Sequence, residues 1–109
     1  MTYEIPGIEK VDHYERGLQQ NIQQAVIGMN EIRKQLIEAN AKLGHVRQEL
    51  STAESDFDQS EEHMVILRAH KLRVRDQESV VRGLHLLLDG LKQSHTKHSK
   101  DLNEHRKNT

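Results

Sequence analysis

LQQNIQQAVIGMNEIRKQLIEANAKLGHVRQELSTAESDF, residues 18–57, repeats apolar side chains at alternating steps of four and three residues. Heptad position a is occupied by Ile22, Met29, Leu36, Leu43 and Leu50, and position d by Leu18, Ala25, Ile32, Ala39, Val46 and Ala53. An ordinary amphipathic helix has a period of about 3.6 residues and would drift off this stripe as heptads accumulate. A repeat of about 3.5 residues that holds over such a length is therefore typical of a coiled-coil helix.

A second heptad repeat begins at Leu67 and is out of phase with the first. It runs through Leu67, His70, Val74, Gln77, Val81, Leu84, Leu88, Leu91, His95, His98, Leu102 and His105. Either one continuous helix contains an irregularity, or the chain turns back and each helix keeps its own phase. Residues 51–63, STAESDFDQSEEH, are rich in Ser, Thr and Asp, which prefer caps and turns to helix interiors. This composition favours a turn, although the segment has no Gly or Pro.

The packing order also favours an antiparallel hairpin, because small side chains of the first helix then face larger ones of the second. The expected layers include Ile22 opposite Leu91, Ala25 opposite Leu88, Ala39 opposite Val74 and Val46 opposite Leu67. We therefore predict an all-α fold of one domain, an antiparallel helical hairpin or coiled coil. Its expected parts are an N-terminal tail at residues 1–8, helix 1 at 9–52, a turn at 53–58 and helix 2 at 59–106. The alternative is one long helix in a parallel coiled-coil dimer.

The composition suits extended helix packing better than a thick globular core. Of 109 residues, 34% are hydrophobic, with one Phe, two Tyr and no Trp, whereas globular domains are about 45–50% apolar. The absence of cysteine excludes disulfides and thiolate chemistry. The apolar runs are short and the N-terminus lacks signal-peptide features, so we expect a cytoplasmic protein without a membrane span. The formal net charge of −1 gives no general reason to expect nucleic-acid binding.

Several apolar residues fall outside the two seams, namely Val26, Ile27, Ile37, Leu72, Val80, Leu86 and Leu87. A hairpin of two helices would leave these side chains in water, and a second layer of helices would cover them. We therefore predict a homo-oligomer in which another copy completes a four-helix assembly. The alternative is that they are scattered exposed aliphatic side chains, which are common on protein surfaces.

No pattern typical of catalysis occurs in the sequence. It lacks a glycine-rich phosphate loop, an HExxH motif and a nucleophile placed beside a base, so we predict no enzymatic activity and no cofactor. The expected function is that of a coiled-coil protein–protein interaction module, with an adaptor, assembly or chaperone-like role, that docks partner helices. The predicted interaction seam consists of Leu18, Ile22, Met29, Ile32, Leu36, Leu43, Val46, Val81, Leu84, Leu88 and Leu91.

The segment LRAHKLRVR, residues 67–75, supports an alternative function. Its basic side chains would contact phosphate groups and make the chain a small helical nucleic-acid-binding regulator. These candidate contacts are Arg68, Lys71, Arg73 and Arg75. No aromatic side chain accompanies them to stack on bases, and two acidic residues follow directly. The other interpretation is a solvated helix face with local ion pairs.

Three of the eight histidines, His95, His98 and His105, lie on the seam of the second helix. Imidazole binds zinc, but a stable site takes three or four ligands. We therefore predict no metal site and retain these three residues as the candidate ligands if one exists. Histidines in a seam also suit pH sensing, and a polar, frayed helix end is the third interpretation. The expected register places His98 opposite Glu15.

Overall fold

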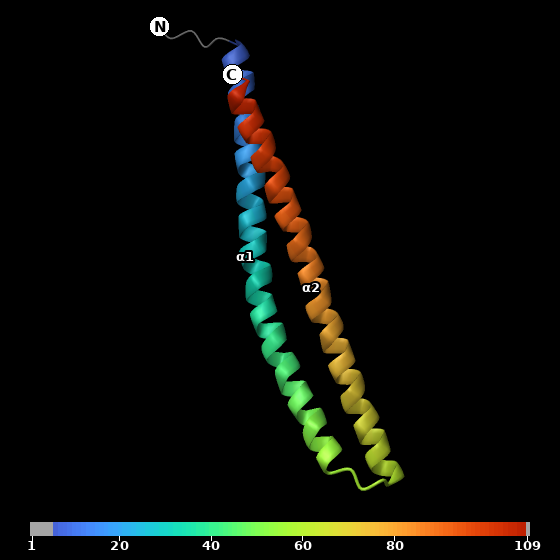
Figure 1. Ribbon diagram of the computed structural model, residues 1–109. Coiled ribbons are helices and arrows are strands. Elements are labelled where there is room, and N and C mark those ends of the chain that lie inside the picture. The colour runs from blue at the N-terminus through green and yellow to red at the C-terminus, as the bar shows by residue number, and fades with distance from the viewer. Residues whose placement is uncertain (1–5, 109) are drawn as a thin grey trace. The chain divides into compact units, whose positions relative to one another are not determined.

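The computed structural model describes the backbone of residues 6–108 and the side chains of residues 13–108. Within that range it contains two long helices, α1 (Pro6–Ser55) and α2 (Glu61–Lys107), and no strand. The chain reverses direction after Ser55, so the helices form an antiparallel hairpin (Figure 1). The predicted all-α hairpin is confirmed. The alternative of one continuous helix is wrong, because residues 56–60 are not helical.

α1 extends beyond both of its predicted bounds, whereas α2 begins two residues later and ends one residue later than predicted. α1 begins at Pro6 because proline suits the first turn of a helix, where its missing N–H leaves no hydrogen bond unmade. The first five residues of the tail predicted at 1–8 lie outside the described residues. α2 ends at Lys107, and its last turn carries His105, Arg106 and Lys107. Basic side chains at this end complement the negative pole of the helix dipole.

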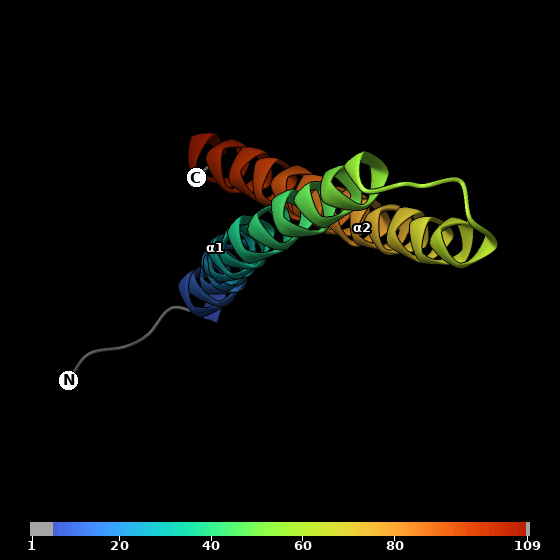
Figure 2. The same cartoon turned by 90° about the horizontal axis from the view of Figure 1, so that it is seen from below.

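The turn at residues 56–60 is polar except for the half-buried Phe57, and Figure 2 shows it from below. The backbone amide of Ser60 donates a hydrogen bond to Asp58 Oδ1 at 2.9 Å. Ser60 Oγ in turn accepts one from the backbone amide of His63 at 3.2 Å, which caps the first turn of α2. Gln59 adopts the left-handed conformation, with a φ angle of 64°. These contacts reverse the chain without Gly or Pro.

Asp58 supports the turn through its negative charge. Hydrogen bonds from the hydroxyl and amide groups of Ser60, together with the nearby ring of His63, lower the pKa of Asp58 from its ordinary 3.8 to about 2. Asp58 Oδ1 lies 2.5 Å from His63 Nδ1. The ionised form is therefore favoured in the folded state. Its contribution is complete above the ordinary pKa and is lost as the pH falls through about 2.

The paired helices divide into two compact units, which are described separately. Unit 1 comprises Met1–Glu31 with Leu88–Thr109, and unit 2 comprises Ile32–Leu87. The core of unit 2 is a cluster of Leu43, Val46 and Val74, with Leu50 and Val81 packed against it. The buried hydrophobic side chains of unit 1 are Leu18, Ala25, Met29, Leu88 and Leu102.

The register of the helices in unit 2 differs from the predicted order. Gln77 Nε2 donates a buried hydrogen bond to the backbone carbonyl oxygen of Ala39 at 3.0 Å. Val74 packs with Val46 and not in the predicted layer with Ala39. The turn lies further along the chain than residues 53–58. Because each residue by which a turn moves changes the pairing by two residues, the predicted layers are wrong.

Unit 1 shows an offset in the same direction. A Cβ atom at Gly28 would lie 3.1 Å from Leu91 Cδ1, so Leu91 packs further along α1 than the predicted layer. Glu15 Oε1 accepts a hydrogen bond from Arg106 Nε at 2.6 Å. The expectation that His98 lies opposite Glu15 is therefore wrong.

Candidate interaction surface

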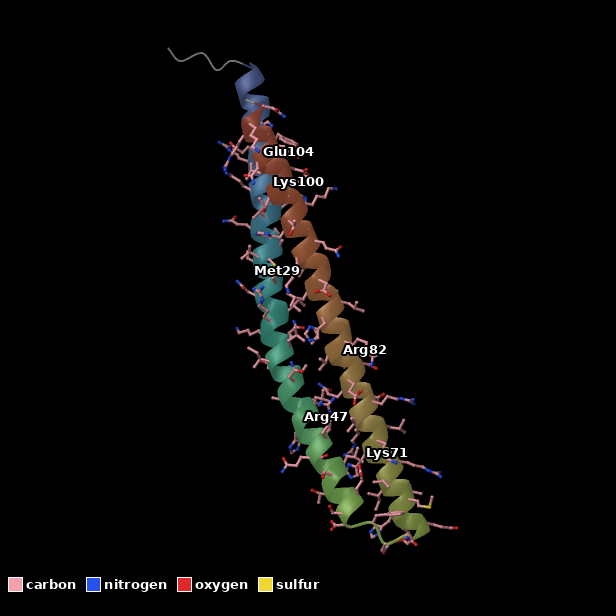
Figure 3. All side chains as sticks on the ribbon, viewed as in Figure 1. Met29, Arg47, Lys71, Arg82, Lys100 and Glu104 are labelled. Atoms are coloured by element: carbon pink, nitrogen blue, oxygen red, sulfur yellow. The ribbon has the colours of Figure 1, made fainter. Side chains whose placement is uncertain are left out.

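The predicted interaction seam faces inward. Leu18, Met29, Leu36, Leu43, Val46 and Leu88 are buried, and Ile22, Ile32, Val81, Leu84 and Leu91 are half-buried. This burial is reached within a single chain, so the hairpin itself covers these side chains. Figure 3 labels Met29 on α1 as one of them. A partner must therefore dock elsewhere, unless it separates the two helices.

Two ion pairs identify the two sides of the seam in unit 2. Glu49 Oε2 lies 3.8 Å from Arg73 Nη1. Arg47 Nη2 lies 3.7 Å from Glu78 Oε1. In the heptad frames the first pair occupies positions g and the second pair positions e, which flank an antiparallel seam on opposite sides. We call these sides the Glu49 face and the Arg47 face.

A groove of about 540 Å³ opens next to the turn on the Glu49 face. It is lined by His45, Gln48, Glu49, Thr52, Ala53, Asp56, His63, Ile66 and His70. Ala53 is a small residue at a seam position and leaves space between the helices. Ile66 adds an apolar wall, while Glu49 of α1 and Asp56 of the turn make the opposite wall acidic. Between residues 13 and 108, no three His, Cys, Asp or Glu side chains are grouped so as to hold a metal ion.

Beside the groove, α2 exposes large aliphatic side chains that occupy positions f and g of its frame. We call this set the aliphatic row; it consists of Val65, Ile66, Leu72, Val80, Leu86 and Leu87. Their side chains are between 47% and 68% exposed. Side chains that recur at these positions share one side of a helix, here the Glu49 face and its outer edge. Arg73 and Ser79 occupy two of these f and g positions and interrupt the row, which continues on the same side of α2 beyond them.

Small residues accompany the aliphatic row. Ala69 and Gly83 occupy position c, directly beside it, with Asp76 between them. A Cβ atom at Gly83 would meet no other atom within 4 Å, so space is open above this position. Another helix can therefore approach the backbone of α2 closely on this side.

The structure divides the predicted basic segment between two faces. Arg68, Lys71 and Arg75 fall at positions b and e of α2, on the side of the Arg47 face, and all three are exposed. Arg73 points to the Glu49 face, where it pairs with Glu49. Arg82, which the sequence analysis did not include, joins the first group at position b. Arg47, Lys71 and Arg82 are labelled in Figure 3.

The three candidate metal ligands of α2 make separate contacts. His98 Nδ1 lies 2.7 Å from the backbone carbonyl oxygen of Ser94, which requires that this nitrogen donate the hydrogen bond. The ring of His105 meets the edge of Tyr14, with centroids 4.8 Å apart. His95 is half-buried. No metal-binding group forms from these residues in the described part of the chain.

Sequence reasoning missed the groove and two members of the aliphatic row. Val65 and Ile66 lie in the short apolar run MVIL, whose members point to different sides of a helix. The signal that identifies Ile66 is its spacing of two heptads from Val80 and three from Leu87, once the α2 frame is fixed. The groove depends on the register, which the sequence analysis placed incorrectly.

No family model, curated protein or solved structure matches this chain. Neither helix, over the residues that the structure describes, has a segment long and apolar enough to cross a membrane.

Proposed function

We propose that the chain is a protein–protein interaction module without a catalytic role, which docks an amphipathic partner helix on the aliphatic row of α2. The observation that supports this function is that the row stays exposed although the hairpin has already buried its own seam. A helix with apolar side chains three and four residues apart would cover the row in the helix-in-groove mode. The docking residues are therefore on the outer side of α2 and not in the predicted seam.

The size of the row sets the expected strength of docking. Completing the burial of a half-exposed aliphatic side chain contributes about 1–1.5 kcal/mol. Six such side chains contribute about 6–9 kcal/mol, which is similar to the association cost of about 4–15 kcal/mol. Because this gain and this cost nearly cancel, we expect weak and readily reversible binding, as suits an adaptor, assembly or chaperone-like role.

The charge around the row selects the chemistry of the partner helix. The Glu49 face carries Glu38, Lys42 and Glu49 on α1 and Asp56 in the turn, so it is acidic on balance, and Glu49 already pairs with Arg73. A partner with Lys or Arg beside its apolar stripe would place positive charge against this face. Complementary charge of this kind speeds association and selects the partner more than it adds affinity.

A designed helical peptide tests the proposal. The probe has three heptads with Leu on one side and Lys on the flanks, and carries a fluorophore for anisotropy titration. We expect saturable binding by the wild-type chain and loss of at least tenfold in affinity in the double variant Val80→Glu/Leu87→Glu. Ile37→Glu is the matched control, since Ile37 is 72% exposed but lies on α1 outside the row. Equal binding by the two variants would remove the row as the docking surface.

A second candidate function is nucleic-acid binding by the Arg47 face. The supporting observation is that Arg68, Lys71, Arg75 and Arg82 are exposed on one side of α2. Such a set would bind phosphates with strong salt dependence. Retention on immobilised heparin or RNA should then fall when Arg75→Gln and Arg82→Gln are combined, and Arg73→Gln should have no effect. Elution that does not depend on salt would exclude this function.

A further inference from the structure

We propose that the partner of the aliphatic row is a second copy of this chain, with the two α2 helices packed antiparallel about a two-fold axis near Ser79. This inference rests on the proposed function, because it names the helix that docks on the same surface. It involves unit 2 of each copy, which contains the whole aliphatic row. A two-fold axis makes every contact between different residues occur twice, so a few matched pairs decide the interface.

The order of large and small side chains fits this axis. Antiparallel pairing centred at the level of Glu78 and Ser79 brings Leu87 of the second copy beside Ala69, so a large side chain meets a small one. It also brings Leu72 beside Leu86 of the second copy at the flank of the interface. Large and small side chains that alternate across an interface interdigitate, as close packing requires.

The same pairing separates like charges. In a parallel pair, position for position, Arg73 would lie beside its own copy and so would Asp76. Like charges in contact across an interface act against that arrangement. In the antiparallel pair Arg73 lies beside Gly83 of the second copy, over which space is open, and Asp76 lies beside Val80 of the second copy, so neither charge meets a like charge. The charges of the row thus favour the antiparallel order.

The groove on the Glu49 face also acquires an occupant. Leu87 of the second copy, beside Ala69, is next to Ile66 and His70, which line the groove. The apolar end of the row therefore covers the apolar wall of the groove.

Single cysteines test the pairing directly, because the chain has no cysteine of its own. Ser79→Cys places a thiol at the axis, and Gln93→Cys places one at the same heptad position two heptads further along α2. In the antiparallel pair the Gln93 positions lie about 42 Å apart at about 1.5 Å of rise per residue. With a short bismaleimide, we expect Ser79→Cys to form cross-linked dimer at least tenfold faster than Gln93→Cys.

Two further variants complete this experiment. Adding Val80→Glu to Ser79→Cys should abolish the cross-link, and adding Ile37→Glu should leave it unchanged. Equal rates for the two single cysteines would indicate a parallel pair, and no cross-link at either position would indicate a monomer; either result overturns the inference. If the chain does not cross-link but still binds the designed peptide, the proposed function stands and only the second copy is the wrong partner.

Discussion

The two units are built from the same pair of helices but differ in what α2 presents on its inner and outer sides. In unit 2 the inward positions of α2 hold Leu67, Val74, Val81 and Leu84, together with the buried Gln77 and the half-buried His70. In unit 1 the inward positions include His95, His98 and His105. On the outer side, the α2 part of unit 2 carries the aliphatic row, whereas residues 88–108 expose no large hydrophobic side chain. Unit 2 therefore combines the aliphatic core cluster with the exposed aliphatic row.

The largest expected effect comes from removing matched core leucines. Leu43→Ala should lower the free energy of unfolding by about 3 kcal/mol, because Leu43 sits in the aliphatic cluster of unit 2. Leu102→Ala should cost about 2 kcal/mol, since histidines precede and follow Leu102 along the unit 1 seam. Urea denaturation at a fixed low concentration measures both. Equal losses would show that the two cores do not differ in packing.

Gln77 tests whether unit 2 relies on a polar contact for its register. Gln77→Ala should cost about 1–2 kcal/mol, because it removes a buried hydrogen bond and leaves space in the seam. Gln77→Leu should raise the free energy of unfolding. It should also widen the range of distances between the two helices, because no polar group then fixes their relative position. Spin labels on the two helices of unit 2 would report this as a wider distance distribution. An unchanged distribution in Gln77→Leu would show that apolar packing alone sets the register.

Two glycines compare the closeness of packing in the two units. Gly44→Ala in unit 2 should stabilise the chain by about 1 kcal/mol, because a Cβ atom there meets nothing within 4 Å and the helix propensity rises. Gly28→Ala in unit 1 should gain less, since its Cβ would press on Leu91 at 3.1 Å. Thermal denaturation of both variants distinguishes these outcomes. An equal gain would mean that Leu91 moves aside freely.

The smallest expected effect is at the turn of unit 2. Asp58→Asn removes a carboxylate whose pKa is lowered to about 2, so it should lower the melting temperature at neutral pH. As the pH falls from the ordinary pKa of the carboxyl group to about 2, the wild type loses this contribution and the variant has none to lose. The difference in melting temperature should therefore shrink with acidification. A difference that stays constant down to pH 2 would rule out the charge of Asp58 as its cause.

Much of this architecture follows from the sequence. The heptad repeat of α1 and the second frame of α2 predict two helices and identify the residues that lie between them. The phase change indicates a reversal of the chain. These features are local periodicities, and a single sequence is enough to detect them.

The register did not follow from the sequence, because the turn has no Gly or Pro to mark its position. A shift of the turn by a few residues still pairs one apolar heptad with another, so size complementarity alone did not exclude the wrong layers. The hydrogen bond between Gln77 and Ala39 fixes the alignment, and a lone Gln in a heptad repeat gives no sign of its acceptor.

The predicted interaction seam differs from the exposed aliphatic row for a related reason. The seam residues are the most regular apolar residues in the chain, but the hairpin uses them internally. The outer residues Leu72, Val80, Leu86 and Leu87 were recognised as unexplained by the seam. That these residues lie on the same side of α2 as Val65 and Ile66 became clear only from the heptad positions of the folded helix.

Sedimentation equilibrium over a range of concentrations tests most directly whether the aliphatic row is an association surface. We expect the wild-type chain and Ile37→Glu to approach twice the mass of 12.7 kDa as concentration rises. Val80→Glu/Leu87→Glu should remain at the monomer mass throughout. A wild-type chain that stays at the monomer mass, or a double variant that dimerises as well as the wild type, would contradict the account.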